Sequence, residues 1–429
     1  MIIKNGYVID PANKKEGLFD ILIKGYKISK VAKGISAKEE TIDAKGKIVV
    51  PGLIDMHVHL REPGREDIET VKSGTRAAVS GGMTSVCTMP NTYPPIDDAK
   101  VVNNLKGVIK KDASSNVFII GAITKGRDGK NVVDIKKLRE SGVIALSDDG
   151  NGIQDKNAIS AALKKAKENN MLLISHCEDI SISRNGVVNE GIVATKLGLR
   201  GIPKSSEYSM VKRDIELARK NKTKIHIAHV SCKESVDIIR KAKKSGVSVT
   251  AETAPHYFSL TDSCCETYDT RTKMNPPLRS AEDVDAIKAG IKDGTIDVIA
   301  SDHAPHGKHE KEIEFEFAAF GIIGLETSLA LSITGLVDTK YISLKRLVEL
   351  MSVNPAKILG LKSKGSLSEG SDADITIIDP KKEWTFTKDL INSKSKNSPF
   401  IDWQLKGKAT DVIVGGKLLL QNEKLVEHG

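Results

Sequence analysis

The stretch HVHLREPG, residues 57–64, places His57, His59 and Arg61 at every second position. It follows an apolar run, residues 48–50, that is typical of a β-strand. Side chains at alternate positions of a strand point to the same face, so these three are predicted to face one spot. Two imidazoles are common ligands of a divalent metal, and a guanidinium can grip a carboxylate in two places.

Eight short apolar segments predict the strands that would position these groups, and most intervals between them are long enough for a helix. Residues 155–169, 206–221 and 280–293 are such intervals. Alternating strands and helices with eight strands predict a parallel (β/α)8 barrel of the TIM type. A doubly wound open sheet is the alternative, but the sequence has no GxGxxG or GxxxxGK[ST] loop. The predicted strands are 54–60, 85–90, 118–125, 143–148, 172–177, 225–230, 248–253 and 297–302.

The carboxyl ends of barrel strands are where catalytic groups stand. His226 and His229 lie three residues apart and point to opposite faces, which favours His229 as a ligand and His226 as a structural residue. Only one of the neighbours Asp148 and Asp149 can face the centre. A lone histidine there is more often a core residue, but a converging set of imidazoles and carboxylates predicts a metal site. The converging set is His57, His59, Asp148 or Asp149, His176, His229 and Asp302.

Both ends of the chain are rich in short β-prone segments. They lie at 1–3, 7–9, 20–23 and 47–50, and again at 373–379 and 409–416. Because chain termini often lie close together, the two ends are predicted to build one small β-sandwich domain. The predicted organisation is residues 1–50 and 364–429 for the small domain and residues 51–363 for the barrel.

The composition excludes several classes of protein. Of the 429 residues, 39% are hydrophobic and 28% charged, as in a globular protein. The net charge of +9 comes from dispersed lysines, and aromatic residues make up only 4%, so no nucleic-acid-binding stripe is predicted. No apolar run approaches the ~20 residues of a membrane helix, and no signal peptide is recognisable. Five cysteines, an odd number, argue against a disulfide framework, so a cytoplasmic protein that binds no membrane is expected.

Nine motifs occur in order along nearly the whole chain: PGLIDMHVHLREPG (51–64), MPNT (89–92), SDDGNGIQD (147–155), HCED (176–179), HIAHVS (226–231), KMNPPLR (273–279), IASDHAPH (299–306), FGIIGLET (320–327) and GSDADITIID (370–379). They resemble the metal-dependent amidohydrolase superfamily and, more closely, dihydroorotases of the class I bacterial type. HxH alone is shared across the superfamily. The combination of HLREPG with MPNT, KMNPPLR and SDHAPH is much more specific.

The resemblance implies two Zn²⁺ ions per subunit. His57, His59 and Asp302 would hold one ion, and His176 and His229 the second. Asp149 would bridge them, where many relatives use a carboxylated lysine. Asp302 would also be the catalytic acid and base. The implied substrate-binding groups are Arg61, Asn91, Asn275, His306 and the backbone at Phe320 and Gly321.

The resemblance implies reversible cyclisation of N-carbamoyl-L-aspartate to L-dihydroorotate plus water, in pyrimidine biosynthesis, by a homodimer. Two alternative functions remain open. A hydantoinase or allantoinase usually bridges its metals with lysine and needs no arginine for a substrate carboxylate. A non-catalytic partner of aspartate transcarbamoylase would have lost metal ligands, whereas all six are present here; a catalytic chain that also binds the transcarbamoylase stays open.

Two positions depart from the pattern of these relatives. Ala319 stands where a proline usually precedes the Phe-Gly of the last motif, and His256-Tyr257 stands where two histidines are frequent. Because of these two departures the geometry of the loops cannot be predicted from the relatives. The predicted metal ligands are not affected. The highly charged segment 306–320 is predicted to be a mobile lid.

Overall fold

The computed structural model describes residues 1–427, so the last two residues of the predicted segment 364–429 lie outside it. Eight strands form one parallel sheet in their order along the chain. Val58 bridges His303 in parallel and the His59 N–H donates to the His303 carbonyl at 2.9 Å, which closes the sheet into a barrel. The barrel prediction is confirmed, and every predicted strand overlaps an observed one. The strands are β8 (Leu53–Val58), β9 (Met83–Thr88), β10 (Asn116–Gly121), β11 (Val143–Ser147), β12 (Leu172–Ser175), β15 (Ile225–Ile227), β16 (Val249–Thr253) and β17 (Val298–Ile299).

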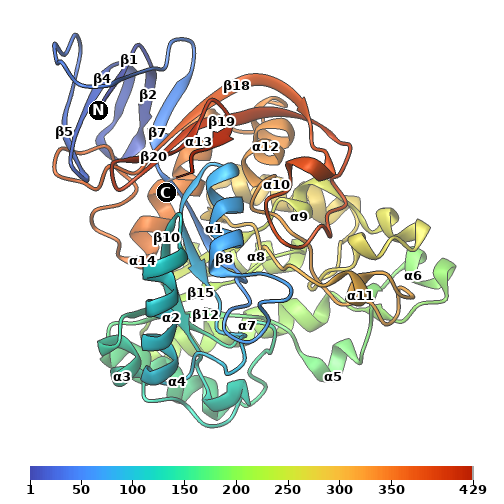
Figure 1. The fold of residues 1–429 in the computed structure, drawn as a ribbon. Coiled ribbons are helices and arrows are strands. Elements are labelled where there is room, and N and C mark those ends of the chain that lie inside the picture. Colours follow the sequence, from blue (N-terminus) through green and yellow to red (C-terminus); the bar gives the residue numbers. More distant parts are fainter. Residues whose placement is uncertain (428–429) are drawn as a thin grey trace.

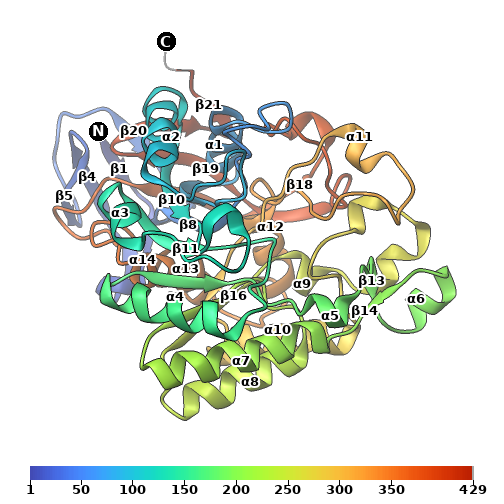
Figure 2. The ribbon, with the colours of Figure 1, turned by 90° about the horizontal axis from the view of Figure 1, so that it is seen from below.

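Helices cover the outside of the barrel between successive strands (Figures 1 and 2). Each turns an apolar face inward: α4 (Lys156–Glu168) buries Ala158, Ile159, Ala162, Leu163 and Ala166 at helical spacing. The Asp155 side chain caps α4 by accepting from the Asn157 N–H. The other covering helices are α1 (Val71–Ser80), α2 (Ala99–Asp112), α3 (Ile135–Glu140), α7 (Ser205–Asn221), α8 (Lys233–Lys244), α10 (Ala281–Asp293), α12 (Ser328–Ser332), α13 (Leu344–Val348) and α14 (Asn354–Leu359).

The connections that follow β12, β16 and β17 carry small elements of their own. They leave the carboxyl ends of these strands, the end at which the candidate ligands stand. The elements are α5 (Ile180–Ser183), β13 (Val188–Asn189), α6 (Ile192–Leu197), β14 (Gly201–Ile202), α9 (His256–Ser259) and α11 (Lys308–Lys311).

The two ends of the chain build a β-sandwich beside the barrel, as predicted (Figure 1). One sheet has the order β5-β4-β1-β6, with β1 (Ile2–Lys4), β4 (Asp20–Lys24), β5 (Lys27–Ala32) and β6 (Thr41–Asp43). The other has the order β21-β20-β19-β18-β7-β2-β3, so both termini contribute to it. Its strands are β2 (Tyr7–Asp10), β3 (Lys15–Leu18), β7 (Ile48–Pro51), β18 (Ile375–Thr385), β19 (Gln404–Val414), β20 (Lys417–Gln421) and β21 (Lys424–Leu425).

The seven-stranded sheet packs on both of its faces. On one face Val49 and Ile375 share a core with Ile3 of the four-stranded sheet. On the other face Val50 and Val412 join the core of the barrel and its helices. Because β7 leads directly into β8, this packing fixes the start of the strand that ends at the first two candidate histidines. No helix among residues 1–427 is long and apolar enough to cross a lipid bilayer.

Candidate active site

The first predicted ligand group lies together at the closure of the barrel. His57 and His59 stand at the end of β8, and Asp302 follows β17. The Oδ1 atom of Asp302 lies 3.5 Å from His57 Nε2 and 3.4 Å from His59 Nε2. One ligand atom from each of the three lies within 4.8 Å of the others, close enough for one metal ion.

Asp149 lies between this group and a second one. Its Oδ1 atom is 3.3 Å from His57 Nε2, from His176 Nδ1 and from His229 Nε2, and its Oδ2 atom is 3.4 Å from His59 Nε2. His176 Nδ1 and His229 Nε2 are 2.8 Å apart. The structure therefore brings all six predicted ligands together, with one carboxylate at the centre.

The six side chains fit a divalent metal site by their chemistry. His57 Nε2 is buried and has no hydrogen-bond partner among the described residues, and it points toward Asp149 and Asp302. Burial alone would raise the pKa of Asp149, but His57, His176 and His229 hold that pKa well below its ordinary value. A buried carboxylate kept ionised among imidazole nitrogens is an arrangement that binds metal cations.

The histidines are oriented by an outer layer of acceptors. His57 Nδ1 lies 2.6 Å from Glu252 Oε1, and His59 Nδ1 lies 2.7 Å from Asn91 Oδ1. His176 Nε2 is 3.4 Å from Glu178 Oε2. Since a carboxylate can only accept, the Nδ1 of His57 carries a proton, and its Nε2 is the nitrogen that faces the centre. Glu252 and Glu178 were not among the predicted site residues, although Glu252 lies near the end of β16 and Glu178 follows β12.

Three of the predicted site residues have left-handed backbone conformations. The φ angles of Arg61, His229 and Asp302 are 60°, 33° and 49°. This region is uncommon for residues other than glycine, and such strain concentrates at functional sites. The chain therefore leaves regular strand geometry at the residues whose side chains must turn toward the centre.

Three residues near the centre have structural roles. Asp148 accepts from the backbone N–H groups of Ile123 and Thr124, so Asp149 is the aspartate that faces the centre. His226 contacts Thr250 and Glu252, as expected of a structural histidine. His303, for which the sequence suggested no role, lies buried and accepts from the Gly324 N–H while its Nε2 contacts Glu69.

The predicted substrate-binding residues lie around the rim of this cluster. Arg61 donates from Nε to the Pro305 carbonyl at 3.1 Å, and burial lowers its pKa to about 10. Asn275 Nδ2 donates to Glu178 Oε2 at 2.9 Å. His306 donates from Nε2 to the Phe320 carbonyl at 2.7 Å, beside Gly321. Asn91 contacts His59 through Oδ1 and so joins the rim to the ligands.

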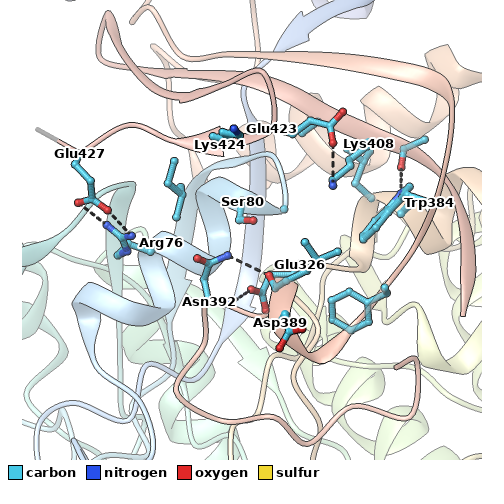
Figure 3. A pocket seen from close by; sticks show the side chains of 18 residues that line it. Arg76, Ser80, Glu326, Trp384, Asp389, Asn392, Lys408, Glu423, Lys424 and Glu427 are labelled. Atoms are coloured by element: carbon cyan, nitrogen blue, oxygen red, sulfur yellow. Dashed lines mark hydrogen bonds and ion pairs between the residues drawn. The ribbon is translucent and has the colours of Figure 1, made fainter. Parts of the chain in front are cut away.

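A C-terminal segment, residues 392–397, supports this rim from outside. Ser395 donates to the His306 carbonyl, and Asn397 donates to the carbonyls of Ala304 and Gly321. Figure 3 shows where the segment begins, in a cavity of about 340 Å³ away from the histidines: the Asn392 N–H donates to the buried carboxyl of Glu326. This cavity holds none of the six candidate ligands.

Comparison with known proteins agrees with this geometry. Residues 46–235 match the family model described as Dihydro-orotase-like. The dihydroorotase of Elusimicrobium minutum (strain Pei191) is 54% identical over 425 residues, which cover 99% of this chain and 98% of that protein. The dihydroorotase of Geobacter metallireducens is 51% identical over 98% of this chain and 99% of that protein.

Solved structures of hydantoinases share the whole fold. The L-hydantoinase from Arthrobacter aurescens has a TM-score of 0.91 at 25% identity, over 99% of this chain and 97% of that chain. The D-hydantoinase from Bacillus sp. AR9 has a TM-score of 0.87 at 25% identity, over 99% and 96%. Fold and site together define a metal-dependent amidohydrolase of the cyclic-amide-hydrolase class. Within that class, identities of about half over nearly the full length show that the chain belongs to the dihydroorotase family.

Proposed function

We propose that the chain is a dihydroorotase of the class I bacterial type, which reversibly cyclises N-carbamoyl-L-aspartate to L-dihydroorotate plus water in pyrimidine biosynthesis. The observation that carries the proposal is the position of Asp149, whose carboxylate oxygens lie within 3.4 Å of nitrogens from four histidines. Asp149 would therefore contribute to both metal sites, and Arg61 stands at the rim where a substrate carboxylate would bind.

His57, His59 and Asp302 would hold one Zn²⁺ ion, and His176 and His229 a second, with Asp149 shared between them. Bound zinc supplies Lewis-acid chemistry that activates water and polarises the carbonyl of the substrate. The protein's own contribution is to hold the imidazoles in one tautomer. Glu252 does this for His57, and Asn91 does so for His59.

Asp302 is proposed to carry the proton. In ring opening its carboxylate takes a proton from the attacking water and gives it to the ring nitrogen as the carbon–nitrogen bond breaks. In ring closure it takes a proton from the ureido nitrogen as that bond forms and passes the proton to the departing carboxyl oxygen, which leaves as water with a second proton from solvent. Asp302 stands within 3.5 Å of both His57 and His59, so it lies beside the reacting centre in either direction.

The substrate carboxylate is proposed to bind Arg61, with Asn91, Asn275 and His306 around the ring and the backbone at Phe320 and Gly321 covering it. The Nε–H of Arg61 donates to the Pro305 carbonyl, and this hydrogen bond fixes the plane of the guanidinium. Hydantoin and allantoin lack the carboxylate at this position. The proposed specificity therefore rests on Arg61, while the hydantoinase-like fold is shared.

The test is ring opening of L-dihydroorotate by the zinc-loaded chain, beside hydantoin and allantoin, with Asp302→Asn as a variant. We expect turnover of dihydroorotate alone and its loss in the variant. Turnover of hydantoin or allantoin instead would contradict the substrate assignment. Zinc binding without any turnover would point to a missing partner chain or to a different cyclic ureide, and the substrate assignment would be withdrawn.

The resemblance also supports a homodimer in the cytoplasm and an association with aspartate transcarbamoylase. Light scattering after size-exclusion chromatography, with the chain alone and with the transcarbamoylase added, tests both. A monomer would contradict the first proposal. Separate elution of the two proteins would contradict the second.

A further inference from the structure

Two buried lysines lie on the two segments that carry proposed substrate-binding groups. Lys273 is two residues before Asn275, and Lys311 belongs to the segment 306–320 that leads to Phe320. Both are nearly inaccessible, with exposed fractions of 2% and 4%. Neither forms an ion pair with a carboxylate among the described residues. A buried ammonium without a carboxylate is unusual and must find other acceptors.

Lys311 reaches three backbone carbonyls from two segments. Its Nζ donates to Ala319 at 2.7 Å, to Gly321 at 3.1 Å and to Lys273 at 3.3 Å. A lysine ammonium has three N–H donors, and all three have acceptors here. The side chain therefore ties the loop of Asn275 to the backbone on both sides of Phe320.

Lys273 connects the same two segments in the other direction, from the loop of Asn275 to the segment of Lys311. Its Nζ donates to the carbonyls of Phe315 and Glu316, each at 2.9 Å, and lies 4.5 Å from the centre of the Phe320 ring. The Gly321 N–H in turn donates to the Lys273 carbonyl at 3.0 Å. Each lysine thus donates to the backbone of the segment that carries the other.

We propose that Lys273 and Lys311 form a reciprocal clasp that positions Asn275 and the Phe320-Gly321 backbone for substrate binding. The proposal rests on the proposed function, because it takes the substrate site from it. The lysines are positioning residues and touch no reacting atom. Burial lowers the pKa of Lys311 to about 7 and that of Lys273 to about 8, because taking each ammonium out of water disfavours its charged form.

The clasp also changes the picture of segment 306–320 as a mobile lid. In this structure the segment is held to the rest of the chain by Lys311, which donates to the Lys273 carbonyl, by Lys273 and by an ion pair between Arg65 and Glu310. Opening it would break the three carbonyl contacts that join the segment to Lys273. The clasp therefore favours a substrate cradle that is formed before the substrate arrives.

The test compares Lys311→Met, Lys273→Met and the double variant with Lys308→Met. Lys308 is a matched control because it lies in the same helix, is exposed and, within residues 1–427, forms its ion pair with Glu312. Unsatisfied buried carbonyls predict a KM for dihydroorotate raised roughly 10-fold to 100-fold in each single clasp variant, with kcat and zinc affinity nearly unchanged. Because Lys311 donates to the Lys273 carbonyl and both lysines join the same two segments, the double variant should raise KM by less than the product of the single effects.

Hydrogen exchange without substrate separates this proposal from the proposed function. We expect Lys311→Met to accelerate exchange in residues 273–275 as well as in 306–321, and Lys273→Met to do the same from the other side. If the wild type failed to turn over dihydroorotate, the function would be wrong while exchange still tested the clasp. Exchange confined to the substituted segment, or a loss of kcat with unchanged KM, would overturn the clasp.

Discussion

Replacing Glu252 by glutamine tests whether the carboxylate that contacts His57 Nδ1 strengthens zinc binding by His57. Glu252 is 1% exposed, and its two oxygens lie 2.6 Å from His57 Nδ1 and 3.2 Å from His226 Nε2. Glutamine has the same shape, and its carbonyl oxygen can still accept from His57. It lacks the negative charge, and its amide group would then face His226 with a donor in place of an acceptor.

The magnitude follows from the negative charge that the His57 hydrogen bond loses and from the acceptor that His226 loses. A hydrogen bond to a charged group contributes about 1.5–3 kcal/mol when it is buried. Substitution of residues that orient metal ligands costs about 10-fold to 100-fold in metal affinity or activity, which is about 1.4–2.7 kcal/mol. The two routes agree, so we expect Glu252→Gln to weaken zinc binding at the His57 site by one to two orders of magnitude.

Competition with a chelator measures this affinity directly. Glu207→Gln is the matched control, because Glu207 is also buried but contacts Ser231 and Arg279 and no candidate ligand. We expect the control to bind zinc as the wild type does. Equal zinc affinity in Glu252→Gln and wild type would refute the idea that this carboxylate raises the basicity of His57.

Three further predictions concern the pH dependence of stability, substrate specificity and stabilisation by zinc. Burial raises the pKa of Glu326 from 4.5 to about 7, so its stabilising contribution is complete below pH 4.5 and is lost as pH rises through 7. Glu326→Gln should therefore be more stable than wild type at pH 8 by up to about 3 kcal/mol, measured by urea unfolding. Arg61→Lys should raise the KM for dihydroorotate roughly 10-fold or more, since a lysine cannot bind a carboxylate through a planar fork. Zinc at 100 times its Kd should stabilise the chain by about 2.7 kcal/mol per site, measured as a rise in Tm over the chelated protein.

Each of these has an outcome that contradicts it. For Glu326 the contradicting result is the same stability difference between variant and wild type at pH 5 and pH 8. For Arg61 it is an unchanged KM, or a KM for hydantoin that changes as much as that for dihydroorotate. For zinc it is a Tm that chelation does not alter.

The sequence predicted the site well where one local rule was enough. Alternate positions along a strand placed His57 and His59 on one face, and the barrel rule placed Asp302 beside them. Spacing could not show which of Asp148 and Asp149 faces the metal site. The answer depends on two backbone N–H groups, of Ile123 and Thr124, that leave the end of the neighbouring strand β10. Spacing within one strand contains no information about those donors.

Partners far apart in sequence were beyond this kind of prediction. Glu252 contacts His57, which lies 195 residues away in the sequence, and Lys311 contacts Lys273, which lies 38 residues away. Buried glutamates and lysines look like the many exposed ones in a chain with 28% charged residues. The short strands β3, β5 and β6 were missed for a related reason, since their polar residues face solvent and only their pairing with neighbours reveals them.

The backbone at Asp302 decides which variant tests the proton carrier cleanly. Its φ of 49° lies in the left-handed region, which aspartate and asparagine tolerate better than other residues with a side chain. Asp302→Asn therefore removes the ionisable group without adding strain, whereas Asp302→Ala adds about 1 kcal/mol of backbone strain. At saturating zinc we expect both variants to lose roughly 100-fold or more in kcat, and the alanine variant to be the less stable of the two by that increment. Equal stability of the two variants would contradict the argument from backbone strain at this position. Wild-type turnover in Asp302→Asn would remove Asp302 from the proposed mechanism, because asparagine keeps its shape and cannot take a proton from water.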